Sequence, residues 1–123
     1  MTAAVVALVL LAALAVFQGL LAGGAPFGRF AWGGQNEVLP TNLRIGSAVS
    51  IALYVGFAVL ILQAAGFVSL LPGGFLGVAI WVLTGYFLLG IAMNAISRSR
   101  AERLTMTPVV ALLAAACLVL ALG

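Results

Sequence analysis

IGSAVSIALYVGFAVLILQAAGFVSLLPGGFLGVAIWVLTGYFLLGIAMNAIS, residues 45–97, contains no charged side chain. A helix needs roughly 20 apolar residues to cross a bilayer, so this segment is long enough for two crossings. The sequence LLPGGF at 70–75 interrupts it, and Pro-Gly-Gly typically ends one helix and begins another. We therefore expect two membrane-spanning helices, near residues 45–66 and 74–97.

The flanking segments predict two further crossings. Residues 2–22 are apolar throughout and lack a basic start, which indicates a first span and not a cleaved signal peptide. A last span is expected near 105–122, with Thr107 as N-cap and Pro108 as first helical residue. A helix counted from there is short for a crossing, so we expect either an earlier start, near Leu104, or a thinner bilayer. The predicted fold is all-α, with residues 1–123 forming one domain, a bundle of four transmembrane helices.

The composition agrees with a membrane protein. The chain is 66% hydrophobic and 6% charged, with a mean hydropathy of +1.36, whereas soluble domains carry about 25% charged residues. The charges lie in the first and third connections, so the positive-inside rule places both connections in the cytoplasm and both termini outside. These charged residues are Arg29, Glu37, Arg44, Arg98, Arg100, Glu102 and Arg103.

The residue inventory excludes several functions. The chain has no His, Asp or Lys, which removes His-based triads, Cys–His pairs and the commoner zinc sites. We expect no catalytic residue, no metal and no cofactor, and Cys117 is expected to be a packing residue. The arginines are too few and too localised for nucleic-acid binding. No ionisable residue lies within a predicted span, so an ion-driven pump is not expected.

Polar residues recur at one depth in all four predicted spans, close to the basic connections. Polar groups in hydrocarbon seek partners, so they form either a hydrogen-bonded layer that locks the bundle or a cavity open to the cytoplasm. Tyr54 and Tyr86 fall near the midpoints of their spans and either pack there or line a pathway. The candidate ligand-binding or vestibule residues, drawn from this layer and the charged connections, are Gln18, Arg29, Glu37, Arg44, Ser50, Asn94, Arg98, Arg100 and Arg103.

The connection GGAPFGRFAWGGQNEVLPTNLR, residues 23–44, is longer than a simple turn between helices. Its aromatic residues beside Arg29 suit the headgroup level of a bilayer. We hypothesise that it covers the cytoplasmic mouth of the bundle, with Glu37 paired to an arginine at 98–103. Arg98 and Glu102 are four residues apart and could pair if the helix continues. The remaining arginines are expected to contact anionic lipid headgroups.

GAPFGRFAWGGQNEVLPTNLRIGSAVSI, residues 24–51, and GYFLLGIAMNAISRSRAERLTMTPV, residues 85–109, resemble a family of small bacterial four-span integral membrane proteins. The resemblance includes both charged connections. It implies a multi-pass protein of the bacterial cytoplasmic (inner) membrane. The family has no assigned activity, so no functional residue is carried over.

These features favour a non-enzymatic membrane protein that acts through assembly or binding. The first alternative is an oligomeric channel or transporter for a small solute or ion. The second is a membrane-lipid enzyme, with Glu37 or Glu102 as general base and arginines holding phosphate. The expected partners are membrane lipids and either a second copy of the chain or another membrane protein. Small residues at four-residue spacing suit packing within the bundle or such an interface: Ala15, Gly19, Gly23, and Ala48, Ala52, Gly56.

Overall fold

The computed structural model describes residues 2–69 and 72–122. Within these residues the chain is helical and has no strand: α1 (Thr2–Ala22), α2 (Thr41–Ala64), α3 (Gly73–Ala95) and α4 (Arg100–Leu122). Two 3₁₀ turns, η1 (Gly28–Phe30) and η2 (Trp32–Gly34), lie between α1 and α2. All four α-helices are long and apolar enough to cross a membrane, which confirms the predicted all-α, four-span architecture.

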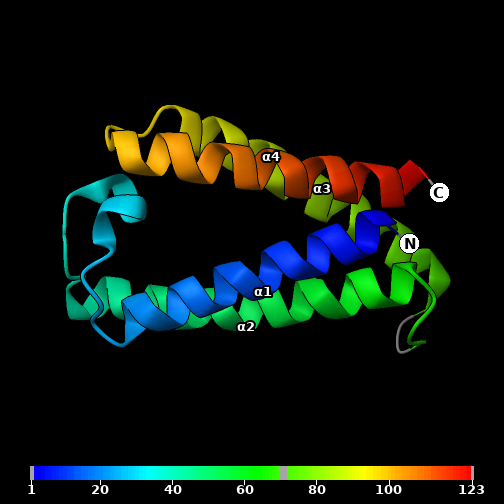
Figure 1. Cartoon of the computed structure of the whole chain (residues 1–123). Helices are drawn as coiled ribbons and strands as arrows, with labels where there is room; N and C mark the ends of the chain where they lie inside the picture. Colours follow the sequence, from blue (N-terminus) through cyan, green and yellow to red (C-terminus); the bar gives the residue numbers. More distant parts are fainter. Residues whose placement is uncertain (1, 70–71, 123) are drawn as a thin grey trace.

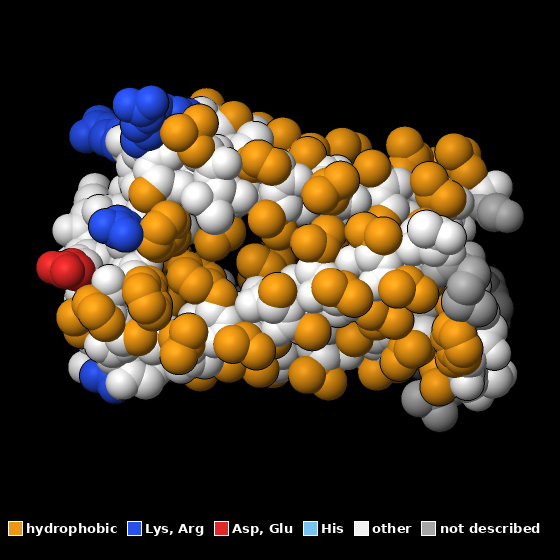
Figure 2. All heavy atoms as spheres, in the orientation of Figure 1, with side chains coloured by type: hydrophobic (Ala, Val, Ile, Leu, Met, Phe, Trp, Pro, Cys, Tyr) orange, Lys and Arg blue, Asp and Glu red, His pale blue; other side chains and the backbone are white. Residues whose placement is uncertain are grey.

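The helices form two antiparallel hairpins, α1–α2 and α3–α4, which lie side by side (Figure 1). The hairpins meet mainly through α1 and α4, and α2 makes few contacts with α3 or α4. The connection between α1 and α2 and the turn between α3 and α4 lie at one end of the bundle, here called the loop end (Figure 1). Figure 2 shows charged side chains only at the loop end of the visible face. That the loop end faces the cytoplasm stays a prediction.

Helix α4 begins at Arg100, before the predicted start of the last span, and Pro108 lies inside it. The predicted cap at Thr107 and Pro108 is therefore wrong. The Ser99 hydroxyl instead accepts the Glu102 backbone N–H at 3.3 Å, as an N-cap residue does. Pro108 has no N–H to donate to Leu104, and membrane helices tolerate such a loss because neighbouring helices stabilise the turn.

The hydrophobic core lies toward the end of the bundle that carries the termini. It combines small residues of α1 and α4, such as Ala4, Ala7 and Ala114, with larger residues of α2 and α3, such as Ile61 and Phe87. Small residues let the helix backbones approach closely, and the buried Thr84 hydroxyl there donates to the Ile80 carbonyl of its own helix at 2.9 Å. Large apolar side chains remain exposed on all four helices, as expected for a surface that faces hydrocarbon.

Candidate functional site

The connection between α1 and α2 adopts a tight conformation that depends on glycine. Trp32, Gly33 and Gly34 have successive φ values of 52°, 81° and 72°, in the left-handed region. A Cβ at Gly34 would lie 2.3 Å from the Ser99 Cβ, and one at Gly28 would lie 1.8 Å from the Asn36 carbonyl oxygen. Trp32 has no such freedom, and its conformation costs about 1–3 kcal/mol, which the surrounding contacts must offset.

Hydrogen bonds fasten this connection to both hairpins. On the α1–α2 side, the Trp32 indole N–H donates to the Ser47 hydroxyl at 3.1 Å, and Ser47 is fully buried. On the α3–α4 side, the Gly33 N–H donates to the Glu102 carboxylate at 3.2 Å. The Ser99 hydroxyl also donates to the Arg29 carbonyl oxygen. The connection therefore bridges the two hairpins and covers the loop end.

The ionic ties expected from the sequence do not form. Among the described residues, neither Glu37 nor Glu102 has an arginine nitrogen within 4.0 Å. Glu37 is exposed and contributes only its carbonyl oxygen, which accepts the Gly28 N–H at 2.8 Å. Glu102 cannot meet Arg98 because its side chain turns inward to the connection. Neutral hydrogen bonds and one carboxylate contact to the backbone hold the cover in place of salt bridges.

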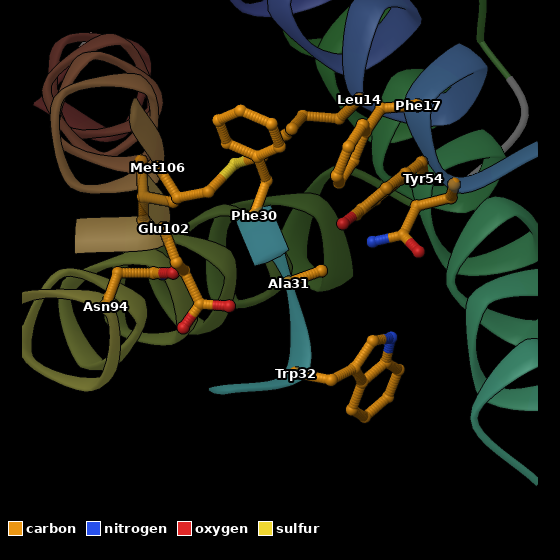
Figure 3. Close-up of a pocket in the computed structure, with 11 residues that line it drawn as sticks. Leu14, Phe17, Phe30, Ala31, Trp32, Tyr54, Asn94, Glu102 and Met106 are labelled. Carbon is orange, nitrogen blue, oxygen red and sulfur yellow. The ribbon is translucent and has the colours of Figure 1, made fainter. Parts of the chain in front are cut away.

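A cavity of about 170 Å³ lies beneath this cover, and Figure 3 shows Tyr54, Asn94 and Glu102 pointing into it. Each of the four helices supplies one polar side chain to its wall, and the connection supplies Phe30, Ala31 and Trp32. A second cavity of about 260 Å³ shares residues with the first and extends to Tyr86. The residues that line the first cavity are Leu14, Phe17, Gln18, Phe30, Ala31, Trp32, Tyr54, Asn94, Glu102, Met106 and Val110.

The polar wall of the cavity carries several hydrogen-bond acceptors, among them one carboxylate. Glu102 is only 7% exposed. The Asn94 amide nitrogen donates to the Gly90 carbonyl at 2.8 Å, which leaves the amide oxygen free to accept. Gln18 lies against the Tyr54 hydroxyl, and its buried Oε1 has no hydrogen-bond partner among the described residues. An acceptor-rich, carboxylate-bearing cavity attracts a hydrogen-bond donor or a cation.

The arginines lie outside this cavity. Arg29, Arg98 and Arg100 are exposed, and the Arg29 guanidinium lies 4.9 Å from the centre of the Phe30 ring. The other two arginines donate to backbone carbonyls: Arg44 Nε donates to Ala22 O at 2.9 Å, and Arg103 Nη1 donates to Ser97 O at 3.1 Å. The Arg44 contact satisfies a carbonyl group that the end of α1 leaves without a helical partner, and the Arg103 contact fastens the turn between α3 and α4.

The structure thus gathers only part of the set expected from the sequence. Gln18, Tyr54 and Asn94 line the first cavity, and Tyr86 lines the second. Ser50 donates its hydroxyl to the Gly46 carbonyl of its own helix at 3.0 Å. The predicted candidates that line neither of these two cavities are Arg29, Glu37, Arg44, Ser50, Arg98, Arg100 and Arg103.

Among the lining residues that were not predicted site candidates, Glu102 and Trp32 make the side-chain hydrogen bonds that fasten the connection. For Glu102 a signal exists, because the Ser-x-x-Glu pattern at 99–102 favours a helix start there, and such a start places Glu102 on the same helix face as Met106 and Val110. For Trp32 no comparable signal exists, since its position depends on the left-handed conformation of the connection.

Comparisons of the chain with protein-family models, with curated proteins and with solved structures gave no match. The class of the protein is therefore assigned from its helices and its cavity alone. It is a four-helix bundle of the multi-pass membrane type with a covered, acceptor-rich cavity at one end. The resemblance to a bacterial four-span family stays a prediction.

Proposed function

We propose that this chain is a multi-pass protein of the bacterial inner membrane that binds a small positively charged solute in the loop-end cavity. The observation that carries this proposal is Glu102, a carboxylate 7% exposed that lines a cavity and has no arginine nitrogen within 4.0 Å among the described residues. Removing such a charge from water costs several kcal/mol unless a counter-charge offsets it. A bound cation would supply that counter-charge.

The other walls of the cavity suit an organic cation. Phe30, Trp32 and Tyr54 bring aromatic rings to the same space. A cation over an aromatic face gains about 0.5–2 kcal/mol, with the larger values where water is excluded. A volume of about 170 Å³ is similar to the engineered cavity of about 150 Å³ that binds benzene. The amide oxygen of Asn94 adds a further acceptor.

The described arginines do not line either cavity, which weighs against a lipid enzyme that holds phosphate. Transport is the second candidate function. It is favoured by the second cavity, which continues the polar wall toward Tyr86 on α3. Beyond that level the buried residues Leu11, Phe87 and Leu113 close the bundle. Passage of a solute would therefore require these side chains to separate, so binding is the function we favour.

Tetramethylammonium tests the proposal as a probe. The protein is placed in phosphatidylglycerol nanodiscs, and a Trp81→Phe background leaves Trp32 as the only tryptophan. Saturable change in Trp32 fluorescence then reports occupation of the cavity. At a separation of about 4 Å and an effective dielectric of about 20, a charge pair contributes about 4 kcal/mol. We therefore expect Glu102→Gln to weaken binding by at least tenfold.

Glu37→Gln is the matched control, because it neutralises the other acidic residue, which is exposed. It should leave the affinity unchanged. Glu102→Gln should keep the cover closed, since the new amide oxygen can still accept the Gly33 N–H. Absence of saturable binding, or equal affinity in the two variants, would refute a cation site at Glu102.

A further inference from the structure

An apolar groove on the exposed surface of the bundle runs directly alongside the cavity. It has a volume of about 410 Å³ and lies between α1, α4 and the connection that covers the loop end. Val16, Leu20 and Phe27 are 65%, 46% and 40% exposed in it. Its lining is Ala13, Val16, Phe17, Leu20, Phe27, Phe30, Thr105 and Met106, so Thr105 is its one polar residue.

Three side chains separate the groove from the cavity, because Phe17, Phe30 and Met106 line both. Figure 3 shows the Phe30 ring beside the Met106 side chain at the edge of the cavity. Met106 is unbranched and adaptable, and Phe30 belongs to η1 of the connection and not to a long helix. A change of side-chain rotamers could therefore join the two spaces.

The joined space has a sharp division of chemistry. The cavity supplies the Glu102 carboxylate and the Asn94 amide oxygen, and the groove supplies an apolar channel on the exposed surface. Building on the function proposed above, we infer that the bound cation is a single-chain alkylammonium amphiphile. Its ammonium group lies in the cavity, and its hydrocarbon chain leaves through the groove between α1 and α4.

A zwitterionic phospholipid fits this arrangement less well. Its phosphate lies within a few bonds of its amine and would be carried toward Glu102, where like charges repel. The cavity has no described arginine in its wall to compensate. The single-chain cation has no such second charge, so it is the occupant to which we commit.

The test uses a chain-length series of tetramethylammonium, butyltrimethylammonium and octyltrimethylammonium, with octanesulfonate as the oppositely charged counterpart. Binding is measured by Trp32 fluorescence in the Trp81→Phe background, in phosphatidylglycerol nanodiscs, and corrected for partition into protein-free nanodiscs. Burial of a methylene group strengthens binding by up to about fourfold, which corresponds to about 0.8 kcal/mol. We expect the octyl cation to bind at least tenfold tighter than tetramethylammonium and octanesulfonate not to bind.

Val16→Phe fills the groove, and Val9→Phe places the same bulk on an exposed position of α1 that does not line it. Val16→Phe should weaken octyl binding at least tenfold and leave tetramethylammonium binding unchanged. Ala13→Phe, a second groove variant, should do the same if Val16→Phe fails to assemble. Val9→Phe should match the parent protein with every ligand.

Two outcomes would refute binding of the hydrocarbon chain in the groove while leaving the cation site intact. One is octyl affinity equal to that of tetramethylammonium, with both still weakened by Glu102→Gln. The other is the same octyl affinity in Val16→Phe and Val9→Phe. Co-purification of a stoichiometric phospholipid that the octyl cation does not displace would also overturn the proposed occupant. If tetramethylammonium shows no saturable binding to the parent protein, that result counts against the proposed function instead.

Discussion

Gly34→Ala should open the cover of the cavity, and the structure supplies an internal control for it. A Cβ at Gly34 would lie 2.3 Å from the Ser99 Cβ and 2.6 Å from its Oγ, whereas a Cβ at Gly33 would meet nothing within 4 Å. Both glycines have positive φ, so alanine at either position carries the same backbone strain of about 1–2 kcal/mol. Only Gly34→Ala also displaces α4 from the connection.

The additional cost at Gly34 comes from the contacts that Ser99 and its neighbours make. Displacing Ser99 breaks its hydrogen bond to the Arg29 carbonyl, worth about 0.5–1.5 kcal/mol. It also strains the Gly33 contact to Glu102, and bonds to charged groups are worth about 1.5–3 kcal/mol. We therefore expect Gly34→Ala to lower the free energy of local opening by at least about 1.4 kcal/mol more than Gly33→Ala, a factor of ten.

Hydrogen exchange of the backbone amides of residues 28–37 measures this opening directly. Exchange in Gly33→Ala should be moderately faster than in the parent protein, and exchange in Gly34→Ala at least tenfold faster again. Amides in the α1–α4 core should be unaffected in both variants. Equal exchange rates in the two variants would refute the reasoning, because they would mean that the connection does not rest on Ser99.

Three further predictions concern other contacts. Trp32→Phe and Ser47→Ala should each destabilise the cover by about 1 kcal/mol, and the double variant should be no less stable than either single variant, because both remove the same hydrogen bond. If hydrogen exchange shows that the losses of protection in the two single variants add up in the double variant, the bond is contradicted. Asn94→Leu should change stability in detergent by only about 0.6 kcal/mol, because its amide bonds within its own helix, yet weaken tetramethylammonium binding by removing an acceptor; unchanged affinity would remove Asn94 from the site. In a cysteine-free variant, an impermeant thiol reagent added to intact cells should label Pro72→Cys and not Gln35→Cys, because arginines favour the cytoplasmic side; the reverse labelling would invert the topology.

The number and approximate places of the helices could be predicted from the sequence, because the thickness of the hydrocarbon core imposes a length on any apolar helix. The positions of the four spans also predicted that the charged residues gather at one end of the bundle. Connections one and three of a four-helix hairpin arrangement lie at the same end, whatever the packing of the helices. The start of α4 was missed because Thr107 and Pro108 form a plausible cap, while the competing signal at Ser99 and Glu102 lay among arginines assigned to a loop.

The composition of the site is a different matter, because it depends on how each helix is rotated about its own axis. Each helix of this chain carries apolar residues on all sides, so periodicity gives little indication of which face turns inward. Tertiary packing alone brings Gln18, Tyr54, Asn94 and Glu102 to one cavity from four different helices. The left-handed backbone at Trp32 and the glycines that follow it then turn the Gly33 N–H toward Glu102. That contact holds the buried Glu102 carboxylate toward the connection, because a carboxylate removed from water must have a hydrogen-bond donor or a cation as partner.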